Sequence, residues 1–313
     1  MIARNVIINA ARDVGFDLVG VVRAESLDAE HKMFGEWLLR GHHSTLSYLE
    51  RNVDKRFDAR LLVDGARSVV VCAVSYMSVY SRGYAEGCST KIASYALARD
   101  YHVTIKDMLR ALAARLEECA PRLRYRAFTD SAPVAEKSLA VRAGMGWIGR
   151  NSLVVTPERG SMLLLGELII DEDVDEYDRP LETVGCGECR RCVEACPNAA
   201  IMDNRLIDTH RCISCRTIER EGSAEDVELD GWIFGCDACQ SVCPYNRRAP
   251  LHANPAFDPL FDPTALDDAA WLRMTTEEFS AMAGDTPTTR AGLERIQGNI
   301  RSCLNFTLVS HKN

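Results

Sequence analysis

The stretch GCGECRRCVEACP at residues 185–197, followed by CDACQSVCP at residues 236–244, determines how this chain is organised. The first segment reads Cys-x2-Cys-x2-Cys-x3-Cys-Pro, a spacing that holds [4Fe–4S] clusters. Its two-residue gaps let a tight loop present three thiolates to one cube, and the three-residue gap carries the fourth cysteine to another. The second segment lacks its first cysteine, because Ile233 stands at that position. The sequence therefore predicts two clusters, with one ligand supplied from elsewhere.

Crossed ligation divides the thiols into two sets, because the last cysteine of each run binds the cluster of the other run. The first set is Cys186, Cys189, Cys192 and Cys243. The second set is Cys196, Cys236 and Cys239, with either Cys212 or Cys215. Zinc is the alternative, since Cys-x2-Cys pairs also build four-cysteine zinc sites. A zinc ribbon needs neither two Cys-Pro endings nor seven thiols in this order, so we favour [4Fe–4S] clusters.

The composition indicates an ordinary globular protein, with 47% hydrophobic and 26% charged residues among 313. Its longest apolar runs, Val69–Val74 and Met162–Ile170, have the length of strands, so we expect no membrane association. The first 16 residues show helical periodicity and contain Asp13, unlike the apolar centre of a signal peptide. Cysteines outside the two runs are scattered, which suits a reducing compartment. We expect a cytoplasmic monomer.

Hydrophobic periodicity predicts the main elements of the chain. We expect helices at 4–13, at 31–39 and before Pro121, and buried strands at 16–22, 68–77, 125–128 and 162–170. The strand at 125–128 enters a polar turn, and Pro133 is expected in the first turn of the following helix. The predicted fold is an α/β (α+β) body at residues 1–177, an inserted ferredoxin-like module at 178–250, and a helical C-terminal segment at 251–313 packed on the body.

The middle of the chain is similar to a known family. The segment FTDSAPVAEK at residues 128–137 continues into AGMGWIGRN at residues 143–151. With the two cysteine runs, and with RFDARLL at 56–62 and RDYH at 99–102, it resembles the epoxyqueuosine reductases. These are cobalamin-dependent enzymes of queuosine biosynthesis. The resemblance covers residues 5 to 250.

The resemblance implies that the body binds cobalamin and that the chain reduces epoxyqueuosine to queuosine at the tRNA wobble position. It implies a tRNA anticodon stem-loop as substrate and an external low-potential electron donor. In the family pattern Cys212 is the cluster ligand, and Cys215 stands where an aromatic residue is usual. The cobalamin contacts that it implies are Arg56, Tyr95, Asp130, Ser131, Asn151, Val154, Ser214 and Gly235.

Asp130 is the candidate catalytic residue. Converting an epoxide to an alkene takes two electrons and releases water, so a general acid is needed for the leaving oxygen. Asp130 follows the predicted strand at 125–128, at the kind of strand end where α/β sheets often bind ligands, and the family's proton donor aligns with it. The alternative is that Asp130 only caps the next helix, because carboxylates favour caps.

Two other functions share some of these features. A reductive dehalogenase-like corrinoid iron–sulfur reductase would use the same cofactors, but such enzymes usually carry a twin-arginine leader, and the N-terminus shows none. If the chain were a ferredoxin-type electron carrier, Asp130 and the long body would have no function. The net charge of −8 argues against a general nucleic-acid coat, so RNA contacts should be local. The candidates are Arg190, Arg191, Arg205, Arg211, Arg216, Arg220, Arg247, Arg248, Arg290, Arg295 and Arg301.

Overall fold

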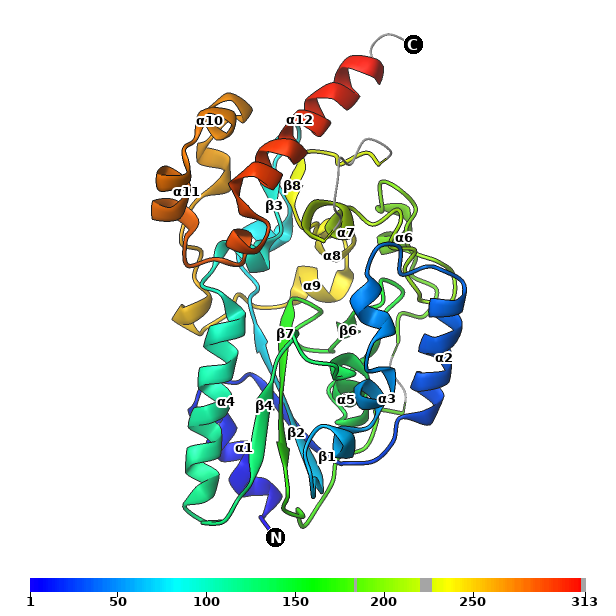
Figure 1. Cartoon of the computed structure of the whole chain (residues 1–313), viewed down its shortest axis with the longest axis vertical. Coiled ribbons are helices and arrows are strands. Elements are labelled where there is room, and N and C mark those ends of the chain that lie inside the picture. Colours follow the sequence, from blue (N-terminus) through cyan, green and yellow to red (C-terminus); the bar gives the residue numbers. More distant parts are fainter. Residues whose placement is uncertain (183–184, 220–226, 311–313) are drawn as a thin grey trace.

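Four antiparallel strands form the central sheet of the body, in the order β1–β2–β7–β4 (Figure 1). Their bounds are β1 Leu18–Arg23, β2 Ser68–Ser75, β7 Leu163–Ile170 and β4 Tyr125–Phe128. The computed structural model describes residues 1–182, 185–219 and 227–310. All four strands lie within three residues of the predicted bounds. Neighbouring strands run antiparallel, so the carboxyl ends of the strands do not gather at one edge of this sheet. The Asp130 site is formed instead by the contacts of Asp130 itself.

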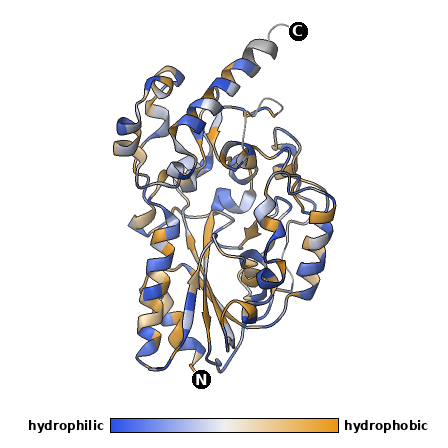
Figure 2. Cartoon of the chain, viewed as in Figure 1, coloured by the Kyte–Doolittle hydropathy of each residue, from blue (hydrophilic) through white to orange (hydrophobic). Residues whose placement is uncertain are grey.

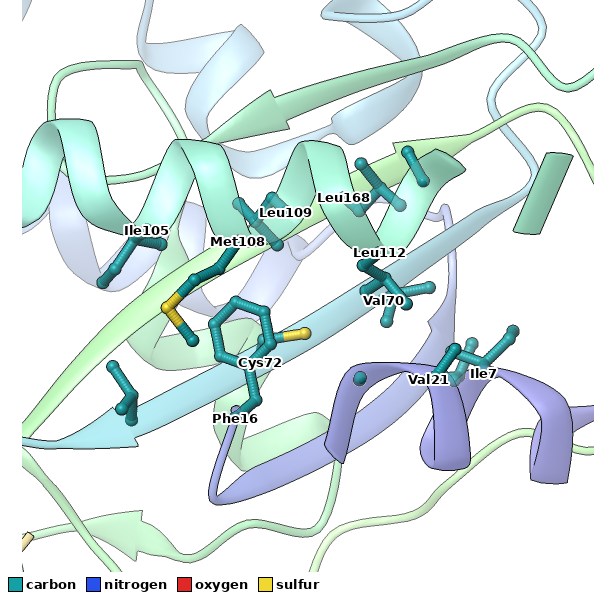
Figure 3. Close-up of a cluster of buried hydrophobic side chains, with 14 of the residues drawn as sticks. Ile7, Phe16, Val21, Val70, Cys72, Ile105, Met108, Leu109, Leu112 and Leu168 are labelled. Carbon is teal, nitrogen blue, oxygen red and sulfur yellow. The ribbon is translucent and has the colours of Figure 1, made fainter. Parts of the chain in front are cut away.

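Strand β2 is buried along its whole length because helices cover both faces of the sheet. Alternate side chains point to opposite faces, so Val70 and Cys72 join one core, and Val69 and Val71 join the other. The first core is closed by α1 (Arg4–Asp13) and α4 (Tyr101–Glu117). Figure 3 shows side chains of α4 meeting those of α1 and the strands over the sheet. Each fully buried aliphatic side chain of this kind contributes about 1.5–3 kcal/mol.

The second core lies under α2 (Asp28–Leu39), α3 (Val53–Phe57) and α5 (Glu136–Arg142). A short hairpin, β5 (Trp147–Ile148) with β6 (Val154–Val155), follows α5. The prediction that Pro133 lies in the first turn of this helix is wrong, since α5 begins at Glu136. Asp130 has a left-handed backbone with φ of 53°, and the chain stays non-helical until Ala135.

The cysteine-rich module is joined to the body by a two-stranded parallel sheet of β3 (Lys91–Ile92) and β8 (Trp232–Phe234). Its helices are one turn or two long: α6 Arg191–Glu194, α7 Ile213–Ile218, α8 Ala238–Ser241 and α9 Pro244–Arg248. Pro244 occupies the first position of α9, where its missing N–H costs no hydrogen bond. Cysteines therefore stand at helix starts and in the tight loops between helices.

The C-terminal segment forms α10 (Asp268–Arg273), α11 (Thr276–Ala283) and α12 (Gly292–Ser310). Trp271, Ile296 and Ile300 are fully buried against Ile233 and Phe234 of the module. Figure 2 shows the strands of the body as mainly hydrophobic and the outer helices as mixed. Across the described residues, the helices are all too short or too polar to span a membrane. The remaining short elements are 3-10 turns at Ser47–Glu50, Ala59–Leu61, Tyr80–Arg82, Ser94–Leu97, Pro255–Phe257, Pro263–Ala265 and Pro287–Arg290.

Candidate active site

A cavity of about 280 Å³ lies where the body, the module and the C-terminal segment meet. The body contributes Asp130, from the loop after β4, and the start of α4. The module contributes Cys212 and Ser214 at the start of α7, and the C-terminal segment contributes Arg290. An aromatic wall is formed by Tyr95, Tyr101 and Phe234. The cavity thus joins a carboxylate, a predicted cluster ligand and a cation.

Asp130 is fixed by a chain of hydrogen bonds that begins at the N-terminus of α4. Asp100 caps α4, and its Oδ1 lies 2.8 Å from Nδ1 of His102. The other ring nitrogen, Nε2, lies 2.9 Å from Oδ2 of Asp130, and the Tyr101 hydroxyl donates to the same oxygen at 2.9 Å. Because both nitrogens of His102 face carboxylates, the imidazolium form is favoured. Asp130 caps no helix, so the capping alternative is wrong.

The protonation states follow from these contacts. Burial raises the pKa of Asp130, but the hydrogen bonds from His102 and Tyr101 and the charges of His102 and Arg290 outweigh it, so the net pKa is lowered. The hydrogen bond with Asp130 raises the pKa of His102, and Asp100 adds to this effect while burial opposes it. These contacts favour the ionised form of Asp130 and the protonated form of His102. Sequence reasoning missed His102, although Asp-x-His ahead of a long helix is a recognisable signal.

Arg290 links Asp130 to the module. Its Nη1 lies 3.7 Å from Oδ2 of Asp130, and its Nη2 lies 3.0 Å from Oε1 of Glu219. Burial lowers the pKa of Arg290, but the two carboxylates outweigh this effect and raise it. The structure therefore places this arginine, predicted as an RNA contact, inside the cavity.

The cysteines predicted for the two clusters lie near other thiols of the module, and their division into two ligand sets stays a prediction. Burial and then the neighbouring thiols Cys186, Cys243 and Cys189 raise the pKa of Cys192. In the other group, burial likewise raises the pKa of Cys236 and Cys239, and the neighbouring thiols include Cys212 for both and Cys196 for Cys239. Iron would convert such thiols to thiolates. Cys239 also faces Cys192, so the two groups are adjacent.

The residues predicted to contact cobalamin are distributed unevenly around the cavity. Tyr95, Asp130 and Ser214 line it. Gly235 follows Phe234, with φ of 65°, and an added Cβ would lie 2.5 Å from that of Ala93. Five of the eight lie outside the cavity lining. Besides Gly235 and Arg56 these are Ser131, which is exposed, Asn151, which is buried in a turn, and Val154, which packs in the second core.

Arg56 has an unusual environment. Burial lowers the pKa of its guanidinium, which lies 5.6 Å from the Phe34 ring and feels the charges of Tyr48, Glu136 and Asp130. Within the part of the chain that the structure describes, its buried Nε has no hydrogen-bond partner. A polar oxygen from a bound group would satisfy it.

The other arginines predicted to contact RNA differ in exposure. Arg216 is only 4% exposed, and its Nε donates to the carbonyl of His210, so its prediction as a surface contact is wrong. Arg190 pairs with Asp203 at 2.9 Å, and Arg295 is partly buried. Arg220 lies outside the described residues. The exposed ones are Arg190, Arg191, Arg205, Arg211, Arg247, Arg248 and Arg301.

Comparison with known proteins decides the family. A family model described as "Epoxyqueuosine reductase QueG, DUF1730" matches residues 56–131, and a "4Fe-4S double cluster binding domain" matches residues 185–246. The epoxyqueuosine reductase of Cyclobacterium marinum is 40% identical over 298 residues, which cover 94% of each chain. The chain belongs to the epoxyqueuosine reductase family. The predicted resemblance, the oxidoreductase class and the double [4Fe–4S] module are therefore confirmed.

Further members of the epoxyqueuosine reductase family agree with this assignment. The Pseudomonas aeruginosa enzyme is 36% identical over 92% of this chain and 81% of its own. A crystal structure of epoxyqueuosine reductase with an epoxyqueuosine-modified tRNA-Tyr stem loop has a TM-score of 0.85 at 27% identity, covering 95% of this chain and 80% of that one. A Bacillus subtilis epoxyqueuosine reductase, with a TM-score of 0.83 at 27% identity and the same coverage, has its catalytic aspartate loop swung out of the active site.

Proposed function

We propose that this chain reduces epoxyqueuosine in tRNA to queuosine, with the Asp130–His102 pair supplying the proton for the leaving oxygen. One observation carries this proposal: Asp130 and the predicted cluster ligand Cys212 line the same cavity. A source of protons and a source of electrons thus face one reaction space. Kinship with epoxyqueuosine reductases over 94% of the chain supports the substrate.

The reaction balances with two electrons and two protons. The epoxide loses its oxygen as water, and a carbon–carbon double bond forms between the two former epoxide carbons. Asp130 accepts a proton from the imidazolium of His102, whose Nε2 lies 2.9 Å from Oδ2, and passes it to the oxygen. Because Tyr101 and Arg290 also face Oδ2 of Asp130, the carboxylate keeps one orientation towards the cavity.

The module would hold two [4Fe–4S] clusters, which would supply single-electron transfer. We propose Cys186, Cys189, Cys192 and Cys243 for one, and Cys196, Cys212, Cys236 and Cys239 for the other. Cys212, which lines the cavity, would hold the second cluster beside it. An external low-potential donor would then deliver electrons at the first.

Cobalamin fits the residues of this site. The aromatic wall of Tyr95 and Phe234 offers an apolar surface, and the buried Nε of Arg56 needs an acceptor such as an amide or phosphate oxygen. Ser214 and the chain at Gly235 would hold the opposite side. Cobalamin, when bound, supplies a centre that stores reducing equivalents next to the substrate. Asn151 and Val154, which lie outside the cavity lining, would act only through the backbone near the hairpin.

The tRNA substrate also needs a binding surface on the chain. A tRNA anticodon stem-loop would lie over the exposed arginines of the module, and its wobble nucleoside would enter the cavity. We propose that residues 1–177 form the cofactor-binding body, 178–250 the cluster module and 251–313 the segment that closes the cavity. A cytoplasmic monomer suits a tRNA-modifying enzyme.

The test is anaerobic reconstitution with iron, sulfide and cobalamin, followed by a nucleoside assay on epoxyqueuosine-containing tRNA. Formation of queuosine with a chemical reductant supports the proposal. Reduction of halogenated aromatics, with no reaction on tRNA, would instead indicate the dehalogenase alternative. Electron transfer to other proteins without either reaction would indicate an electron carrier.

A further inference from the structure

The strand LLLGELII (β7, Leu163–Ile170) contains one acidic residue in an otherwise apolar sequence. Glu167 is fully buried and lies opposite Phe128 of β4 and Val71 of β2 in the sheet. Removing a carboxyl group from water is costly unless it finds a partner. A buried carboxyl group in the central sheet therefore indicates a structural or functional role for this residue.

The partner of Glu167 is Glu136, the first residue of α5. Two ionised carboxylates can only accept hydrogen bonds, so they bind each other only when they share a proton. Burial raises the pKa of Glu167 well above its usual range, and burial raises the pKa of Glu136 to about 7. Among the described residues no conventional donor reaches either oxygen of Glu167. Burial and the charge of Glu136 raise the pKa of Glu167, which favours Glu167 as the protonated member of the pair.

Glu136 has a second contact, towards the active site. Its Oε1 accepts the backbone N–H of Asp130 at 2.5 Å. Asp130 has a left-handed backbone, with φ of 53°, which a residue other than glycine adopts only when its surroundings hold it there. The buried carboxyl pair is thus joined directly to the residue that faces the cavity.

Other charged and titratable groups lie near Glu136 and Glu167. Lys137 donates to the carbonyl of Ser152 at 2.9 Å, and the Arg56 carbonyl accepts the N–H of Ala135 at 2.9 Å. The further groups that face the pair are the Asp130 carboxylate, the Arg56 guanidinium, Tyr101 and Cys72.

We propose that Glu136, held in place by Glu167, is a positioning residue that fastens the Asp130 turn at the cavity. This inference rests on the proposed function, because the position of Asp130 matters only if Asp130 delivers a proton. One side of the turn is already anchored, since Thr129 Oγ1 donates to the carbonyl of Leu165 at 2.7 Å. Glu136 anchors the backbone of Asp130 itself, and so sets where its carboxylate meets His102 and Tyr101.

The test compares Glu136→Ala and Glu136→Gln by amide hydrogen exchange of residues 129–135 and by steady-state kinetics. Glu136→Ala removes the acceptor, so exchange should become about tenfold faster. Its kcat should fall about 10–100-fold with an unchanged KM for the tRNA stem-loop, because the proton donor is misplaced. Glu136→Gln retains an oxygen for the Asp130 N–H and should keep both values near those of the wild type. Glu118→Gln, at an exposed site after α4, is the matched control.

If Glu136→Ala does not fold, Glu136→Asp tests the positioning role of Glu136. Glu136→Asp keeps the charge but shortens the side chain, so faster exchange and lower kcat are again expected. Wild-type exchange in Glu136→Asp and Glu136→Ala would overturn the proposal, as would a Glu136→Gln enzyme as slow as Glu136→Ala. Exchange is measured without substrate, so it decides the positioning role even if the wild-type chain does not reduce epoxyqueuosine.

Discussion

The cluster module and the Asp130 cavity meet at Cys212, yet the sequence encodes them in opposite ways. Seven of the thiols in the module are ordered by gaps of two or three residues, so local loops fix their geometry. The cavity brings His102, Asp130, Cys212 and Arg290 together from segments far apart in the chain. Ligand spacing can be read from a short stretch, whereas the environment of an acid depends on the whole fold.

The carboxyl groups near the cavity show what that environment does. Asp130 has 45% of its side chain exposed and faces His102, Tyr101 and Arg290, which lower its pKa. Glu167, on the neighbouring strand β7, is fully buried beside another acid, and its pKa is raised. The same chemical group is therefore ionised at one position and protonated at the other. The following predictions test the module and the cavity separately.

The largest effect is expected in the module. Cys196→Ser should damage the cluster built mainly from the second run, because crossed ligation sends its sulfur there. Cys212→Ala should damage the same cluster. Both variants should lose turnover and about half of the eight irons expected for two four-iron clusters. Iron and sulfide content and electron paramagnetic resonance of the reduced protein measure this loss.

Cys119→Ala serves as the control for these variants, because Cys119 is exposed and its thiol donates to the carbonyl of Leu116. It should keep both clusters. If Cys196→Ser removed only the cluster of the first run, the crossed assignment would be wrong.

Asp130→Asn should have the next largest effect, and it should be confined to the cavity. The amide keeps the shape of the carboxylate but cannot pass on a proton at neutral pH. We expect kcat to fall by about 100-fold or more, with both clusters and cobalamin binding retained. The control is Asp107→Asn, an exposed residue of α4 paired with Arg110 at 2.7 Å. Normal turnover by Asp130→Asn would show that the proton comes from another donor.

His102→Gln should produce a smaller loss and a change in pH dependence. The pKa of His102 is raised by Asp130, so the imidazolium is complete below the ordinary histidine pKa and is lost as pH rises through the raised value. The wild-type kcat should therefore fall on the alkaline side, and the ion pair should stabilise the fold less there. In His102→Gln kcat should be about tenfold lower at neutral pH, without that alkaline decrease. A decrease that persists in the variant would assign it to a different group.

Local patterns explain which features could be predicted from the sequence. Strand bounds depend on neighbours a few residues apart, and the structure has the four strands close to where they were expected. The cysteine sets depend on equally local spacing and stay a prediction. The helix predicted at Pro133 begins at Glu136, and Asp130 in the turn before it is left-handed and donates its N–H to Glu136. The sequence did not show that Arg290, a predicted RNA contact, lines the cavity, because nothing near it indicates where its 3-10 turn lies in the fold.

Some missed residues did leave a signal. Glu167 interrupts an apolar strand, and a charged residue at such a position indicates a buried polar network. His102 lies two residues after the helix-capping Asp100, a spacing that turns its ring back onto that carboxylate. Neither sequence signal identifies the residue that Glu167 or His102 contacts. That residue is brought close only by the packing of β4, β7 and α4.

The smallest effect is expected for Cys215→Ala, which tests the border between the module and the cavity. Cys215 is buried, lines the cavity and lies one turn after Cys212 on α7. Burial raises the pKa of Cys212, and hydrogen bonds from the backbone of Cys215 and Ser214 partly offset this effect. Cys215 thus supports Cys212 through its backbone N–H, which alanine retains. Iron content and cluster spectra should therefore stay at wild-type values, with a stability loss of about 1 kcal/mol. Loss of half the iron would instead make Cys215 the ligand and move the second cluster further into the cavity.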